Sequence, residues 1–251
     1  MNQPSMAKKP YQFLNANALR LIACVLMVLD HMWATLVPGN DWMTLAGRMA
    51  FPIFAFQIAE GYLHTSNWKR YAKRLLIFAI ISEIPFDLVQ GGTVLYPWDQ
   101  NVMFTLLLGL LSIAALDRFK REKTVKRGIQ ALLAVVGCCL LAEITFVDYR
   151  SPGVLTVVAF WACRNFRGAR LCQLVIMVLL HQFCFQGWYL PVNLFGYSFE
   201  LQTQAFAVLA LIPIWLYNGE KGRHRGRAVQ YASYIFYPLQ FLVLYAIQML
   251  R

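Results

Sequence analysis

Long apolar segments separated by short polar loops run along the whole chain. An α-helix rises about 1.5 Å per residue, so about 20 apolar residues cross the hydrocarbon core of a bilayer. By that criterion the pattern predicts nine membrane-spanning helices, at about residues 17–37, 42–64, 75–90, 101–116, 125–146, 152–163, 171–185, 200–217 and 230–250. We therefore expect an all-α fold, a polytopic helical bundle that forms one transmembrane domain over residues 14–251, after a tail at 1–13.

The composition agrees with this pattern. Of the 251 residues, 59% are hydrophobic and only 14% are charged. Soluble domains are nearer 45–50% apolar and 25% charged, so a soluble domain with a single anchor is excluded. The apolar segments leave no room for a separate soluble domain, and we expect a multi-pass protein of the inner (cytoplasmic) membrane.

The net charge of +11 raises the possibility of nucleic-acid binding. The basic residues, however, lie in the tail and in the loops after the second, fourth, sixth and eighth predicted helices. This alternation is the positive-inside signal of membrane topology. It predicts a cytoplasmic N-terminus, an outside C-terminus and the lipid bilayer as partner, with no nucleic acid.

Six cysteines lie within or beside apolar segments, without CxxC or metal-type spacing. We interpret them as small apolar packing residues and expect no metal site.

Polar side chains interrupt the predicted helices at one depth. A charged side chain in hydrocarbon costs a few kcal/mol, so it persists only with a partner or a function. At 1.5 Å per residue, the polar side chains of the first and third predicted helices lie about 18–24 Å from the cytoplasmic ends of those helices. The candidate catalytic residues are Asp30, His31, Arg48, Glu83, Asp87 and Asn101. Asp99, Glu143 and His181 also map to the outer half.

Two interpretations of this set remain open. Arg48 can form a structural ion pair with Asp30 or Glu83 that holds helices together. Alternatively, His31 acts as a base, oriented by the carboxylate of Glu83 or Asp87, which is the common way to activate a nucleophile. In that case, Arg48 or Asn101 stabilises an oxyanion.

A basic rim is expected at the cytoplasmic side. Lysine and arginine are the usual partners of phosphate, although topology alone also predicts basic residues here. The candidate cofactor-binding residues are Glu60, His64, Lys69, Arg70, Lys73 and Arg74. The sequence contains no P-loop, no GxGxxG and no HExxH motif.

Several short motifs occur in a specific order over residues 14–118. They are Leu29-Asp30-His31, Gly47-Arg48-Met49-Ala50-Phe51-Pro52, Glu60-Gly61-Tyr62, Ile81-Ser82-Glu83-Ile84-Pro85-Phe86-Asp87 and Gln100-Asn101-Val102-Met103-Phe104-Thr105. With these motifs the chain resembles the TraX family.

The resemblance implies an integral membrane acetyltransferase that uses acetyl-CoA, since the family's namesake N-acetylates a conjugative pilin subunit. The family also resembles larger membrane acyltransferases that use a histidine in the first membrane helix, which His31 matches. The implied acceptor is a pilin or another cell-envelope molecule. There are two alternatives to an acetyltransferase. One is proton-coupled transport through Asp30, Glu83 and Asp87, and the other is a non-enzymatic assembly role.

Overall fold

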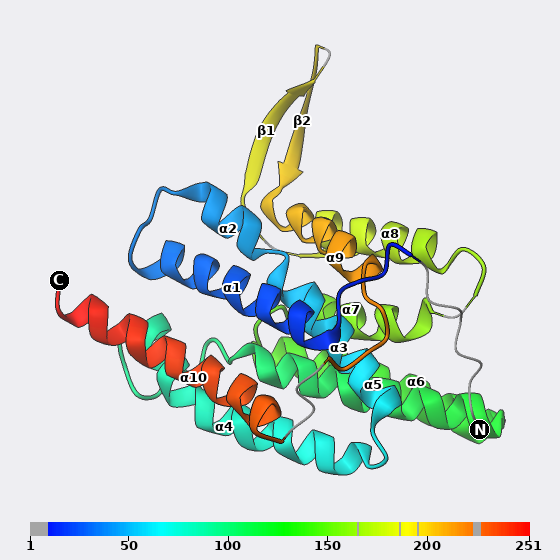
Figure 1. Cartoon of the computed structure of the whole chain (residues 1–251). Coiled ribbons are helices and arrows are strands. Elements are labelled where there is room, and N and C mark those ends of the chain that lie inside the picture. Colours follow the sequence, from blue (N-terminus) through cyan, green and yellow to red (C-terminus); the bar gives the residue numbers. More distant parts are fainter. Residues whose placement is uncertain (1–9, 165, 186, 195, 223–226) are drawn as a thin grey trace.

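The computed structural model describes residues 10–164, 166–185, 187–194, 196–222 and 227–251 (Figure 1). Most of the predicted tail at 1–13 lies outside these residues. The elements are helices α1 (Ala16–Thr35), α2 (Asp41–Gly47), α3 (Ala50–His64), α4 (Trp68–Gly91), α5 (Val102–Glu122), α6 (Val125–Ile144), α7 (Arg150–Ala162) and α8 (Ala169–Leu179), the π-helix η1 (Leu180–Cys184), strands β1 (Tyr189–Leu194) and β2 (Tyr197–Gln202), the 3-10 helix η2 (Thr203–Ala210), and helices α9 (Leu211–Trp215) and α10 (Arg227–Met249).

Four helices of the described chain are long and apolar enough to cross a membrane, namely α1, α5, α6 and residues 231–249 of α10. The exposed face of α6 carries Ile129, Leu132, Leu133 and Leu140, as expected for a helix that faces lipid. The predicted spans at 171–185 and 200–217 fold as shorter apolar helices. The protein is therefore a mostly helical membrane protein, and nine crossings with the stated orientation stay a prediction.

The helix predicted at 42–64 is wrong in one respect, because it breaks into α2 and α3 at Arg48 and Met49. Helix α2 folds back against α1, and Gly47 contacts Asp30 so closely that a Cβ atom has no space there. The break turns Arg48 towards the outer half of α1.

The all-α expectation is also wrong in one place, because residues 189–202 form an antiparallel hairpin where a loop and the start of a helix were predicted. The pairing runs from Tyr189 with Gln202 to Leu194 with Tyr197. Gly196 at the turn has φ +84°, a conformation that glycine adopts without strain. The hairpin projects away from the helices (Figure 1).

The cysteine interpretation fails for two of the six residues. Cys163 after α7 and Cys172 on α8 form a disulfide, because the intervening loop brings their Cα atoms to 5.9 Å. Cys24, Cys138, Cys139 and Cys184 are free thiols.

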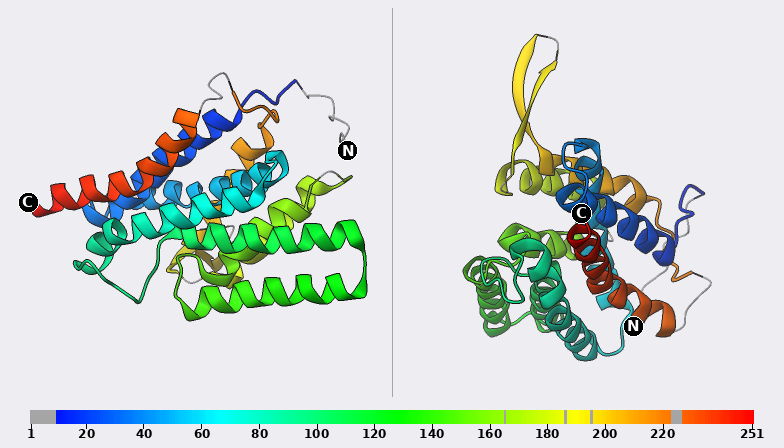
Figure 2. Two further views of the ribbon diagram at one scale, coloured as in Figure 1. Left: turned by 90° about the horizontal axis from the view of Figure 1, so that it is seen from below. Right: turned by 90° about the vertical axis from the view of Figure 1, so that its left-hand side faces the viewer.

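Helix α10 returns to pack on α4 and α1, although it is the last element of the chain. Figure 2 (left) shows α1 and α10 together on one side and the α5–α6 pair on the other. Gly109 lets α5 approach α7, since a Cβ there would lie 2.6 Å from Cβ of Val157. The return of α10 brings Tyr237 and Phe241 into a buried cluster with first-half residues such as Met27 and Met103.

Candidate functional site

An ion pair joins the outer half of α1 to the turn after α2. The Nη2 atom of Arg48 lies 3.2 Å from Oδ1 of Asp30, and both side chains are mostly buried. Thr44 donates to the same carboxylate oxygen at 2.6 Å and accepts from Arg48 at 2.7 Å. Of the two partners considered for Arg48, the structure thus selects Asp30 rather than Glu83.

The same arginine reaches the second half of the chain. Its Nη1 donates to Oε1 of Gln204 on η2 at 3.5 Å. The amide nitrogen of Gln204 lies 3.3 Å from Nδ1 of His181, which is fully buried in the π-helix η1. A turn of π-helix inside an apolar helix often marks a functional position. Sequence reasoning placed His181 at this depth but missed Gln204, for which no motif was visible.

His31 lies beside this network. Its ring packs against Phe241 of α10 at 4.5 Å between centroids. Asp30, Arg48 and Gln240 are near enough to influence it. Its Nδ1 atom is buried and has no hydrogen-bond partner in the described part of the chain.

The carboxylates expected to orient His31 have other partners. The side-chain amide of Asn101 donates to both Glu83 and the carbonyl of Ala79, the latter at 2.8 Å. Its oxygen accepts from the backbone N–H of Met103 at 3.1 Å and so caps α5. Both donors of Asn101 are thus occupied, which argues against a role for it in holding an oxyanion.

Asp87 holds a loop rather than the histidine. Its Oδ2 accepts from the backbone N–H of Tyr96 at 3.0 Å, while its buried Oδ1 has no hydrogen-bond partner among the described residues. The structure therefore places Glu83, Asp87 and Asn101 together around the start of α5. It places Asp30 and Arg48 together next to His31.

A polar cavity of about 360 Å³ opens near this loop. Its lining is Gln90, Tyr96, Trp98, Asp99, Val147, Asp148, Tyr149 and Arg150. Burial raises the pKa of the Asp148 carboxyl to about 8, and the neighbouring Asp99 carboxylate acts in the same direction. Burial also raises the pKa of Asp99. We call this space the outer cavity.

Asp148 connects the outer cavity with the buried set. It is near enough to Arg48 and Asp30 to interact with their charges. Tyr237 of α10 is likewise within electrostatic reach of Asp148 and Glu83. Sequence reasoning missed Asp148, because a single aspartate between two apolar segments looks like an ordinary loop residue.

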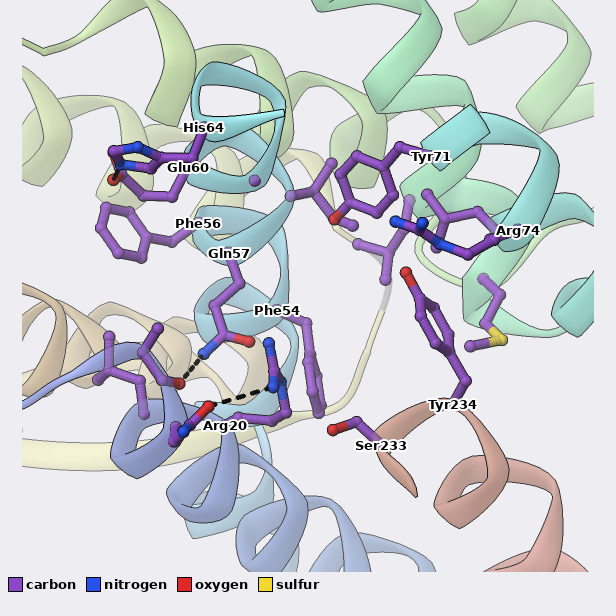
Figure 3. A pocket seen from close by; sticks show the side chains of 18 of the residues that line it. Arg20, Phe54, Phe56, Gln57, Glu60, His64, Tyr71, Arg74, Ser233 and Tyr234 are labelled. Atoms are coloured by element: carbon purple, nitrogen blue, oxygen red, sulfur yellow. Dashed lines mark hydrogen bonds and ion pairs between the residues drawn. The ribbon is translucent and has the colours of Figure 1, made fainter. Parts of the chain in front are cut away.

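A larger cavity of about 410 Å³, the inner cavity, lies between α1, α3, α4 and α10. Figure 3 shows Arg20 from α1, Gln57 from α3, Arg74 from α4 and Tyr234 from α10 around one space. Of the predicted rim, Glu60, His64 and Arg74 line it, whereas Lys69, Arg70 and Lys73 are exposed and do not. Arg20 and Lys221 line it unexpectedly.

At the mouth of the inner cavity, some charged side chains form ion pairs, and Arg74 has a polar atom without a hydrogen-bond partner among the described residues. Glu60 pairs with His64 at 3.3 Å and with Arg164 at 3.3 Å. Arg74 stacks on the Tyr71 ring at 5.6 Å, and its buried Nε has no hydrogen-bond partner in the described chain. Arg74 is therefore well placed to bind an anion, and Glu60 and His64 are better understood as partners of each other.

The inner cavity extends towards His31. Its lining runs along α1 from Asn17 to Met27, a distance of about 15 Å at 1.5 Å per residue. Met27 and His31 lie one turn apart on the same face of α1. At that depth Val102, Met103 and Tyr237 also line the cavity. Among the described residues, no group of three or more His, Cys, Asp or Glu side chains is arranged to hold a metal ion.

Comparison with known proteins identifies the family. The chain is 24% identical over 251 residues to the probable fimbrial assembly protein FimC, serogroup H1, of Dichelobacter nodosus, covering 94% of this chain and 96% of that protein. It is 33% identical over 88 residues to the protein TraX of Escherichia coli, covering 34% of each. No solved structure matches.

The sequence model of the TraX protein family matches residues 15–248. The match thus extends from α1 through α10, well beyond the motifs recognised over residues 14–118. With its helical, membrane-type architecture and this match over nearly its whole length, the chain belongs to the TraX protein family.

Proposed function

We propose that this protein is a membrane-embedded acetyltransferase that carries an acetyl group from cytoplasmic acetyl-CoA to an amine or hydroxyl of an extracytoplasmic acceptor. The observation that carries the proposal is the position of the two cavities. Met27, one helical turn before His31, lines the inner cavity, and Asp148 lines the outer cavity. The buried set around Asp30, Arg48 and His31 lies near both of these lining residues.

The inner cavity suits the donor. Arg20, Arg74 and Lys221 at its mouth supply positive charge for the phosphates of CoA. Its volume is within the usual range for a small-molecule site, and its depth of about 15 Å accommodates an extended arm. In the proposed topology, with the N-terminus in the cytoplasm, this mouth faces the cytoplasmic pool of acetyl-CoA.

The proposed reaction is one acyl transfer. The acceptor nitrogen or oxygen attacks the thioester carbonyl carbon, and Nδ1 of His31 takes the proton that the acceptor loses. The carbon–sulfur bond then breaks, the new C–N or C–O bond remains, and the CoA sulfur leaves with the proton from His31. An acetyl-histidine intermediate is a variant of the same scheme.

Arg48 is the favoured oxyanion donor. Its Nε is buried without a hydrogen-bond partner in the described chain, while Asp30, Thr44 and Gln204 fix the rest of the guanidinium. A fixed donor in a dry site stabilises developing negative charge most effectively. Asn101, considered with Arg48 from the sequence, has no free donor.

The outer cavity suits the acceptor. In this proposal the acceptor group enters the outer cavity, where the lining residue Asp148 is within electrostatic reach of Arg48 and Asp30. A relative of nearly the same length is named a probable fimbrial assembly protein, which supports a pilin-like or other cell-envelope acceptor. The same name favours a second candidate, a non-enzymatic factor in fimbrial or conjugative assembly.

The deciding experiment measures binding and slow hydrolysis of acetyl-CoA by the purified protein in detergent. Wild type is compared with His31→Gln and Arg74→Ala, with Lys69→Ala as the matched control. We expect saturable binding, loss of hydrolysis in His31→Gln and weaker binding in Arg74→Ala only. Folded wild type that does not bind acetyl-CoA would overturn the proposal in favour of assembly. Solute flux in vesicles without acetyl-CoA consumption would indicate transport.

A further inference from the structure

The inner cavity ends at bulky, closely packed side chains. Met27, Met103 and Tyr237 line that end and belong to one buried cluster. Met27 and Met103 are only 7% and 6% exposed. These side chains therefore set how far a ligand can extend towards His31.

The cluster also contacts the histidine. Phe241 lies 4.5 Å from the His31 ring and 5.2 Å from the Tyr237 ring, measured between centroids. Phe86 packs edge-on against Phe241 at 5.5 Å. The aromatic rings thus hold the cavity end and the histidine in a fixed relation, and Met27 lies one turn before His31 on α1.

We propose that Met27 and Met103 determine which acyl chain the donor can carry, admitting an acetyl group and excluding longer ones. This inference rests on the proposed function, because it assumes that the thioester lies at the inner end of the cavity. An acyl chain that is longer by one methylene needs space that the two methionines occupy. In a packed site, one extra methylene changes kcat/KM by about tenfold or more.

Substitution of these methionines should change the acyl-chain length that the cavity admits. Its unbranched side chain fills the end of the cavity without shaping the backbone, so truncation enlarges the cavity more than it rearranges the helices. Met103 also receives a contact from the Ser82 hydroxyl at 3.7 Å to its sulfur, which helps to fix its position. Truncation of either methionine therefore lengthens the space next to His31.

The test measures kcat/KM for hydrolysis of acetyl-, propionyl- and butyryl-CoA by the full chain in detergent. Wild type should prefer acetyl-CoA over propionyl-CoA by about tenfold or more. Met27→Ala and Met103→Ala should each shift the propionyl-to-acetyl ratio by about tenfold towards the longer chain. Met177→Ala, which truncates a methionine that is 1% exposed and outside the cavity, should leave the ratio unchanged.

A third variant tests the opposite direction and does not depend on a cavity-forming change. Val102→Leu adds one methylene at the same end and should further reduce propionyl-CoA turnover relative to acetyl-CoA. Unchanged ratios in all three variants, with active wild type, would overturn the inference and leave the acetyltransferase proposal standing. Wild type that binds and hydrolyses no acyl-CoA would overturn both.

Discussion

The guanidinium of Arg48 and the carboxylate of Asp30 lie 3.2 Å apart, on two segments that the break after α2 brings together. Removing one member of a largely buried pair leaves the other charge without its partner. Asp30→Ala should therefore lower the free energy of unfolding by about 3 kcal/mol. Thermal unfolding in detergent measures the loss.

A double-mutant cycle makes the ion-pair explanation specific. Asp30→Asn combined with Arg48→Gln should cost less than the sum of the two single changes, because each single variant already breaks the same pair. Additive losses would show that the two side chains stabilise the protein independently. Asp41→Asn, at an exposed position, serves as the control.

Gln204 should act on the reaction through Arg48. Its amide lies between the guanidinium and His181, so Gln204→Ala removes one fixed partner of the proposed oxyanion donor. Loss of these buried hydrogen bonds should cost about 1–2 kcal/mol in stability. If Gln204 positions Arg48, Gln204→Ala should lower kcat for acetyl-CoA and leave KM unchanged. If its role is purely structural, only the amount of folded protein should change. Gln130→Ala, on the exposed face of α6, is the matched control.

The cation at the mouth of the inner cavity should govern donor affinity. Arg74→Ala should weaken acetyl-CoA binding by about tenfold, since a charge-assisted hydrogen bond contributes about 1.5–3 kcal/mol. Raising the salt concentration should weaken wild-type binding more than that of the variant. Isothermal titration in detergent measures both effects, and Lys69→Ala should behave as wild type. If Arg74→Ala and Lys69→Ala lose the same affinity for acetyl-CoA, the inner cavity is not the phosphate site.

Asp148 should make stability depend on pH. Burial raises its pKa from 3.8 to about 8 in the folded protein, so the folded state holds a proton that the unfolded state has released. The contribution of this proton to the free energy of unfolding is present in full below pH 4. It is lost as the pH rises to about 8, and the free energy of unfolding falls by at most about 1.4 kcal/mol per pH unit. Asp148→Asn should flatten this part of the curve.

The measurement is the free energy of unfolding from pH 4 to 9, for wild type and Asp148→Asn. Asp41→Asn is the control for removing a carboxylate at an exposed site. A variant with the same slope as wild type would show that Asp148 titrates normally. Asp99, whose pKa burial also raises, should account for part of any slope that remains.

The sequence by itself determined that this is a helical membrane protein with polar side chains at one depth. That information is local, because apolar length and the cost of buried charge depend on single segments. Helical rise alone predicted a common depth for Asp30, His31 and Arg48, and the structure brings these three side chains together. Family membership, too, was visible in the motifs around those residues.

Tertiary structure decided which of these groups are partners. Arg48 pairs with Asp30, Glu83 accepts from Asn101, and Asp87 accepts from the loop before α5. These pairings depend on how the helices rotate and break, which the periodicity of the sequence does not specify. The inclusion of Asp148, Gln204 and Tyr237 depends on interactions between residues far apart in the sequence, such as Arg48 and Gln204, which are 156 positions apart. Helical spacing reports depth along each helix, whereas the cavities form only where packed helices leave space between them.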